Sequence, residues 1–260
     1  MDDRIEIQRA AITVTFRCTL KCKLCGVDAP RYDNPKHFAT NDIKTMISRF
    51  LNMVDYVEEF ELSGGEALMH EDLADIIEYA MNYKDKFGHL YIFTNGTIMP
   101  KEKVWETLRK YNTKSKFFIS NYGRISAKVP QLREKLEEYQ IDYKEKKYYG
   151  EDAHCGGWVD FGDFSLTKYN YKECYYLHSP FCIQIRNGEI HMCGRSYRAM
   201  ELGIIEKNPE QYIDILKPDF DIESERKHFR KLINLEELDV CKYCNGLRPD
   251  SERFMPAEQL

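Results

Sequence analysis

Residues 10–26, AAITVTFRCTLKCKLCG, lead from an apolar segment straight into three closely spaced cysteines. The apolar and β-branched residues at its start predict a buried strand. Cys18, Cys22 and Cys25 follow, with three and then two residues between them. A structural zinc ion takes four protein ligands, commonly from two C-x2–4-C pairs, and this loop holds no fourth Cys or His. Three thiolates suit a 4Fe–4S cluster that leaves one iron open for an exogenous ligand.

Strand and helix patterns alternate through the following residues, as far as residue 149. The expected helices lie within 38–54, 70–88, 101–112 and 127–140, and the expected strands within 58–68, 89–97, 115–123 and 141–149. Thr40 is the expected N-cap of the first helix, and Gly88 the expected end of the second. Short links between alternating strands and helices predict a parallel sheet covered by helices, either open or barrel-like.

Each unusual segment of this half follows a predicted strand. The cysteine loop follows the first strand, and SGGE (63–66), TNGT (94–97) and SNYG (120–123) follow the next three. Chemistry in such folds lies at the carboxyl ends of the strands. The sequence therefore predicts one pocket formed by these four segments.

The pattern changes after residue 150. Residues 182–193, CIQIRNGEIHMC, predict a hairpin around Asn187-Gly188, with Ile185 opposite Ile190 and Cys182 opposite Cys193. Two helical stretches, near 208–216 and 222–237, lead to CKYC at 241–244. We expect one domain over 1–150 and a small second domain over 151–260.

Composition narrows the classes of function. A net charge of −5 and a pI near 5.9 give no basic footprint for nucleic acid. No apolar run approaches the ~20 residues needed to span a bilayer, and MDDRIEIQRA lacks the apolar core of a signal peptide. We therefore expect a cytoplasmic protein without membrane or nucleic-acid partners. In a reducing compartment, its nine cysteines favour metal binding or redox chemistry over disulfides.

The cysteine trio followed by SGGEAL at the second strand end resembles the radical S-adenosylmethionine (SAM) superfamily. The resemblance implies that SAM is the missing ligand of the open iron, and that its reductive cleavage yields a 5′-deoxyadenosyl radical. It also assigns Gly64, Gly65 and Glu66 to the methionine ammonium, and Thr94, Asn95, Ser120 and Asn121 to ribose or carboxylate contacts. The residue before the third cysteine is usually aromatic in this family and packs on adenine; here it is Leu24, which offers apolar packing only.

The tail cysteines resemble the auxiliary-cluster appendage called SPASM, in its shortened twitch form. The fold implied is α/β, a partial (β/α)6 TIM-like barrel with a small C-terminal α+β twitch/SPASM-like domain. One auxiliary 4Fe–4S cluster would be held by four thiolates. Cys193, Cys241 and Cys244 would be joined by Cys174, which fits the family spacing, or by Cys182. A structural zinc ion bound by the same residues is the alternative.

The resemblance implies a radical SAM oxidoreductase acting on a small hydroxylated molecule such as a sugar, nucleotide sugar or aminocyclitol. If an auxiliary cluster accepts an electron, the product is oxidised; if a thiol returns a hydrogen atom, the product is an epimer. Cys155 and Cys182 are the candidate hydrogen donors, and Arg195, near Arg198, is a candidate substrate clamp. The external reductant implied is a flavodoxin or ferredoxin.

Two other functions compete with this hypothesis. A SPASM-type maturase would modify a ribosomally made peptide, but such enzymes often carry a leader-binding domain, and only nine residues precede the first strand here. A non-catalytic iron–sulfur or zinc module would require the GGE turn to be accidental.

Overall fold

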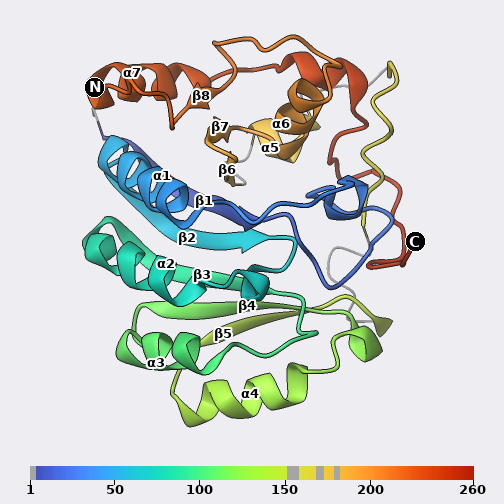
Figure 1. Cartoon of the computed structure of the whole chain (residues 1–260). Helices are drawn as coiled ribbons and strands as arrows, with labels where there is room; N and C mark the ends of the chain where they lie inside the picture. The colour runs from blue at the N-terminus through green and yellow to red at the C-terminus, as the bar shows by residue number, and fades with distance from the viewer. Residues whose placement is uncertain (1–3, 151–157, 168–172, 179–181) are drawn as a thin grey trace.

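A computed structural model describes residues 4–150, 158–167, 173–178 and 182–260. Its central feature is one sheet of eight strands in the order β5-β4-β3-β2-β1-β6-β7-β8 (Figure 1). The strands are β1 (Glu6–Thr15), β2 (Tyr56–Gly64), β3 (Phe87–Thr94), β4 (Ser115–Asn121), β5 (Tyr143–Lys147), β6 (Ile183–Arg186), β7 (Glu189–His191) and β8 (Ile213–Asp214). Strands β1 to β6 pair in parallel, whereas β7 and β8 pair antiparallel. This mixed α/β sheet is consistent with the expected partial barrel.

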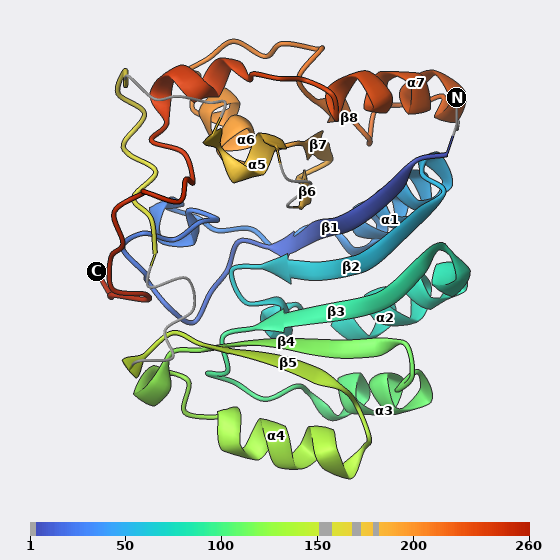
Figure 2. The same cartoon turned by 180° about the vertical axis from the view of Figure 1, so that it is seen from behind.

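Helices connect the first five strands and cover one face of the sheet (Figures 1 and 2). They are α1 (Thr40–Met53), α2 (Leu73–Ala80), α3 (Glu102–Lys110) and α4 (Val129–Glu138). Parallel neighbours need such crossovers, which place each helix against the sheet. Helix α5 (Tyr175–His178) precedes β6, whereas α6 (Gly194–Glu201) and α7 (Ile222–Leu232) follow it. Helix α7 packs beside α1.

Alternation along the strands separates the core from the pocket side. Ile12, Phe60, Ile92 and Phe117 are fully buried in the hydrophobic core, which Phe50 of α1 also enters. Burial of such side chains is worth about 1.5–3 kcal/mol each relative to exposure. The residues between them on each strand face the opposite side of the sheet, where polar groups occur.

The hairpin around Asn187-Gly188 is confirmed, with Ile185 opposite Ile190. Both turn residues have positive φ, 48° and 84°, as a two-residue type I′ turn requires. Strand β6 also pairs with β1, Ala10 lying opposite Ile183. One sheet thus includes strands from both 1–150 and 151–260, and the division into two domains stays a prediction.

Three local predictions were wrong. Helix α1 begins at Thr40, whose hydroxyl donates to Asp72 rather than capping the helix. Gly88 lies inside β3, because residues 81–86 continue α2 as a tighter 3-10 turn and the chain enters the strand at once. Residues 208–216 form turns and β8 instead of a helix, since Ile213 pairs with Ile190 at the sheet edge.

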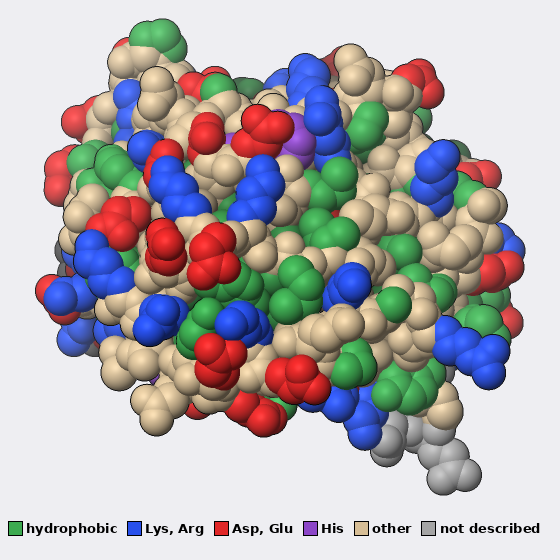
Figure 3. Space-filling view, turned by 60° about the horizontal axis from the view of Figure 1, so that its bottom comes forward, with side chains coloured by type: hydrophobic (Ala, Val, Ile, Leu, Met, Phe, Trp, Pro, Cys, Tyr) green, Lys and Arg blue, Asp and Glu red, His purple; other side chains and the backbone are tan. Residues whose placement is uncertain are grey.

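One face of the molecule, on the side that carries α3 and α4, has a mixed distribution of charge. Acidic and basic side chains are interspersed there (Figure 3). Within the described ranges, no helix is both long enough and apolar enough to cross a membrane.

Candidate active site

The three-cysteine loop follows β1 and is held by hydrogen bonds to its sulfur atoms. The backbone N–H of Leu20 donates to Cys18 Sγ at 3.4 Å, and Asn95 Nδ2 reaches the same sulfur at 3.5 Å. Gln259 Nε2 donates to Cys22 Sγ at 3.4 Å. Burial raises the pKa of all three thiols, that of Cys18 to about 11. Ligation by a metal centre would therefore displace protons from these thiols.

Gly64 and Gly65 stand directly against the start of this loop. Gly65 N donates to Thr15 O and Glu66 N donates to Arg17 O, both at 2.9 Å. A Cβ on Gly64, whose φ is 148°, would lie 2.2 Å from Thr15 O. A Cβ on Gly65 would lie 2.4 Å from Arg17 O and 2.9 Å from Cys18 Cβ. Only glycine permits this approach, so the turn fixes where the first cysteine emerges.

Glu66 joins the glycine turn to the end of β3. Its buried carboxylate accepts hydrogen bonds from Asn95 N at 2.7 Å, Thr94 Oγ1 at 3.1 Å and Leu68 N at 3.2 Å. Burial raises its pKa to about 7, against the opposing effect of these three donors. The carboxylate thus orders two neighbouring strand ends.

Of the other residues predicted to contact the cofactor, some line the central pocket and others lie outside it. Thr94, Asn95 and Ser120 line the central pocket. Asn121 donates to Glu145 at 2.8 Å and accepts from Gly123 N at 2.9 Å, outside that pocket. Leu24 lines a smaller neighbouring pocket with Cys25 and Arg195.

The central pocket has a volume of about 280 Å³ and opens at the carboxyl ends of the strands. The three cysteines, the two glycines and the strand-end residues form its upper part, and Phe93, Tyr122, Trp158 and Tyr176 add aromatic walls. The predicted convergence of the cysteine loop with the SGGE, TNGT and SNYG segments is therefore confirmed.

Arg9, Glu61, Cys182 and Gln184 form the floor of this pocket. Arg9 Nε and Nη2 donate to Glu61 Oε1 at 2.7 and 2.6 Å. The Cys182 thiol donates to the other carboxylate oxygen, Oε2, at 3.8 Å. Glu61 and Cys182 are both buried. Burial raises the pKa of the Cys182 thiol, so it stays protonated at neutral pH.

A second, smaller pocket lies beside the first. Cys174, Cys193, Cys241 and Cys244 all line it, whereas Cys182 does not. Backbone N–H groups donate to two of these sulfurs, Arg195 N to Cys193 at 3.4 Å and Gly246 N to Cys244 at 3.3 Å. Tyr176 lines both pockets and so stands between them. Among the residues that the structure describes, no three Cys, His, Asp or Glu side chains are grouped as ligands of a single metal ion.

Residues 12–120 match the family model described as Radical SAM superfamily. The matched segment contains the cysteine loop, the glycine turn and three of the strand ends that line the central pocket. Residues 12–120 therefore form a radical SAM domain. Such a domain implies a 4Fe–4S cluster and S-adenosylmethionine.

Curated relatives match part of this chain over part of their own length. A probable GTP 3′,8-cyclase from Methanococcus vannielii is 31% identical over 105 residues, 40% of this chain and 33% of that protein. An AdoMet-dependent heme synthase from Nitratidesulfovibrio vulgaris is 32% identical over 89 residues, 34% of this chain and 23% of that protein. The chain thus spans about a third or less of these relatives.

A solved structure resembles the whole chain in fold. The crystal structure of BtrN in complex with AdoMet and 2-DOIA has a TM-score of 0.58 and 18% identity. The likeness covers 96% of this chain and 98% of that one. At this identity the similarity concerns the fold alone.

Arg195 does not line the central pocket. Its guanidinium donates to Gly162 O at 2.8 Å, stacks on the Phe164 ring at 3.6 Å and lies 4.0 Å from Asp28 of the cysteine loop. It also lines the four-cysteine pocket, where its charge favours the thiolate of Cys244. Arg195 therefore connects helix α6 to the cysteine loop and to residues 162–164.

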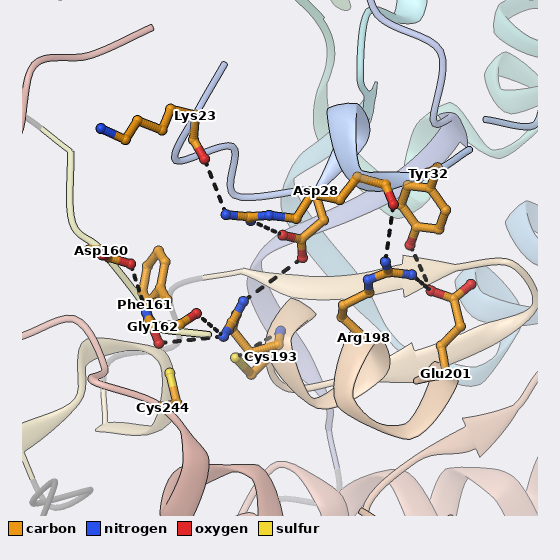
Figure 4. A network of polar contacts seen from close by, with 12 residues as sticks. Lys23, Asp28, Tyr32, Asp160, Phe161, Gly162, Cys193, Arg198, Glu201 and Cys244 are labelled. Carbon is orange, nitrogen blue, oxygen red and sulfur yellow. Dashed lines mark hydrogen bonds and ion pairs between the residues drawn. The ribbon is translucent and has the colours of Figure 1, made fainter. Parts of the chain in front are cut away.

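Arg198 forms a separate link to the region after the cysteine loop. It pairs with Glu201 at 2.6 Å and lies over the Tyr32 ring at 4.3 Å, while Tyr32 itself donates to Glu201 at 2.8 Å (Figure 4). These contacts hold helix α6 against the segment that follows the cysteine loop. Cys155, the other candidate hydrogen donor, lies outside the described residues.

Of the pocket floor, only Cys182 was named from the sequence; Arg9, Glu61 and Gln184 were not, and neither were Tyr176 and Gln259. Glu61 carried a usable signal, because a charged residue alternates there with Phe60 and Leu62 in an otherwise buried strand. Tyr176 and Gln259 carried none, since their positions depend on contacts between distant parts of the chain.

Proposed function

We propose that the protein is a radical SAM oxidoreductase that takes a hydrogen atom from a small hydroxylated substrate, a sugar, nucleotide sugar or aminocyclitol. The observation that carries the proposal is the central pocket, which has the cysteine loop and glycine turn above a buried polar floor. When bound, the cluster and SAM supply a 5′-deoxyadenosyl radical that abstracts the hydrogen atom.

The upper part of the pocket fits the cofactors. Cys18, Cys22 and Cys25 would hold the 4Fe–4S cluster, with SAM on the open iron. The Gly64-Gly65 backbone, which lines the pocket beside the cysteines, would contact the methionine end. Thr94, Asn95 and Ser120 would offer hydrogen bonds to SAM from the lining. Glu66 would orient Thr94 and Asn95 from behind, and Asn121 would hold the end of β4 to Glu145 of β5.

The floor fits a small polar substrate. Arg9 donates its hydrogen bonds to Oε1 of Glu61. The other oxygen, Oε2, accepts from the Cys182 thiol and would be the one that a ligand in the pocket contacts. A buried carboxylate oxygen of this kind selects a ligand that brings a hydroxyl or amine donor. In an oxidation, Glu61 would also accept the hydroxyl proton as the carbonyl forms.

The remaining electron of an oxidation needs an acceptor. We assign that role to one auxiliary 4Fe–4S cluster held by Cys174, Cys193, Cys241 and Cys244 within a twitch/SPASM-like domain over 151–260. All four cysteines line the second pocket. Arg195 N and Gly246 N donate hydrogen bonds to two of their sulfur atoms, and hydrogen bonds of this kind help to set the reduction potential of an iron–sulfur cluster. Tyr176, between the two pockets, would carry the electron.

Epimerisation is the second candidate, and the position of Cys182 favours it. Its thiol lies on the floor, while the cofactor residues lie at the opposite end of the pocket. A hydrogen atom removed from one face of the substrate would be replaced from the other by the Cys182 thiol. One electron from the external reductant and one proton from solvent would then convert the resulting thiyl radical back to the thiol.

Product analysis in D2O separates these outcomes. The reconstituted protein would be incubated with SAM, dithionite and a panel of inositols, aminocyclitols and nucleotide sugars, and 5′-deoxyadenosine would be quantified. Oxidation predicts a carbonyl product and no deuterium at the reacting carbon. Epimerisation predicts one deuterium there, lost in Cys182→Ala, because a thiol exchanges its hydrogen with solvent. Cleavage of SAM that no member of the panel stimulates, but that a peptide does, would support a maturase instead.

A further inference from the structure

Residues 257–260 lie along the three-cysteine loop as a short antiparallel partner. Lys23 N donates to Glu258 O at 2.8 Å, and Leu260 N donates to Lys21 O at 2.9 Å. Cys22 and Gln259 form the bridge between these bonds. Figure 1 shows this red segment beside the blue loop, although more than 230 positions separate them in sequence.

The side chain of Gln259 uses both ends of its amide on this loop. Oε1 accepts a hydrogen bond from Lys21 N at 2.8 Å. Nε2 donates to Cys22 Sγ at 3.4 Å and to Ala257 O at 2.6 Å. The contact to Ala257 orients the amide, so a donor is held toward the sulfur of the middle cysteine.

The preceding residues of the same segment support the pocket wall. Phe254 and Trp158 exchange backbone hydrogen bonds of 2.7 and 2.8 Å, and Trp158 lines the central pocket. One continuous segment therefore contacts both the pocket wall and a cysteine of the trio.

We propose that residues 257–260 clamp the cysteine loop and that Gln259 is a positioning residue that tunes the cluster through Cys22. The inference rests on the proposed function only in assigning a cluster to the three cysteines. A hydrogen bond to a ligand sulfur stabilises the more negative, reduced cluster and so raises its reduction potential. It also holds the thiolate against dissociation.

Redox titration of the full-length, anaerobically reconstituted chain tests this inference. The measured signal is the electron paramagnetic resonance spectrum of the reduced protein. The signal that changes when SAM is added belongs to the cluster at the three-cysteine loop, and this response distinguishes it from the signal of an auxiliary cluster. Gln259→Leu removes all three amide contacts. Gln259→Glu keeps an acceptor for Lys21 N but presents an oxygen to the sulfur. Glu258→Gln is the matched control, because among the described residues that side chain reaches only Lys23, at 3.6 Å.

We expect a more negative midpoint potential in Gln259→Leu, a larger shift in Gln259→Glu, and several-fold faster loss of iron to a chelator in both. Glu258→Gln should behave as wild type. Wild-type potential and iron loss in both Gln259 variants would overturn the inference while leaving the proposed function intact. A wild-type protein without a SAM-responsive signal would instead remove the proposed function, and this inference with it.

Discussion

Replacing Gly65 by alanine should damage the cysteine loop more than it damages the fold. The added Cβ would lie 2.4 Å from Arg17 O and 2.9 Å from Cys18 Cβ, and real contacts of this kind are not shorter than 3.0 Å. The backbone around Cys18 must therefore move by roughly half an ångström or more, which is the tolerance of a working site. The strain should cost about 1–3 kcal/mol of the free energy of unfolding.

Gly88→Ala provides a matched control. Its Cβ would lie 2.6 Å from Glu58 O, a similar backbone clash between β2 and β3, away from the cysteine loop. Both variants should show similar losses of stability in urea denaturation of the metal-free protein. Only Gly65→Ala should lose the SAM-responsive cluster and 5′-deoxyadenosine formation. Full iron content and wild-type SAM cleavage in Gly65→Ala would refute the close-approach argument.

Three further predictions concern the floor, the second pocket and pH. Cys244→Ala should lower the iron content of the reconstituted protein by about four atoms, as expected for the loss of a cluster held by four cysteines, whereas Cys182→Ala should leave it unchanged; equal losses would show that Cys182 is a ligand. Glu61→Gln should raise KM for the substrate found in the panel by about tenfold or more, the effect of losing one charge-assisted hydrogen bond, and Glu59→Gln, outside the pocket, should change it little. Burial raises the pKa of Glu66 to about 7 from 4.5, so its stabilising effect is present below pH 4.5 and is lost as the pH rises toward 7. Urea denaturation of the metal-free protein should show about 3 kcal/mol lost across that window, and Glu66→Gln should flatten the dependence; an unchanged slope would mean that Glu66 titrates normally.

The repeating part of the fold was predictable because its signals are local. Alternating strands and helices, the cysteine loop and the glycine turn each appear within a short window of sequence. Parallel pairing then brings Cys18, Gly65, Asn95 and Ser120 to one edge, where they line one pocket as expected. Helix ends were less predictable, since Gly88 entered a strand instead of ending a helix.

The remainder depends on pairings between distant segments. Strand β6 lies beside β1, which brings Cys182 next to Arg9 and Glu61, and no pattern near residue 182 specifies that neighbour. The same pairing turns Cys182 toward the central pocket while Cys193, near it in the hairpin, faces the second pocket. The contact of Gln259 with Cys22 is likewise set by tertiary packing.

Iron and sulfide content tests the central claim most directly. Anaerobically reconstituted wild-type protein would be compared with a Cys18→Ala, Cys22→Ala, Cys25→Ala triple variant. The account predicts about eight irons in the wild type and about four in the variant, one cluster at the trio and one at the four tail cysteines. Iron that stays the same when the trio is removed would contradict the assignment of a catalytic cluster to the loop. About four irons falling to none, with zinc in the tail, would remove the electron acceptor and leave epimerisation as the better proposal.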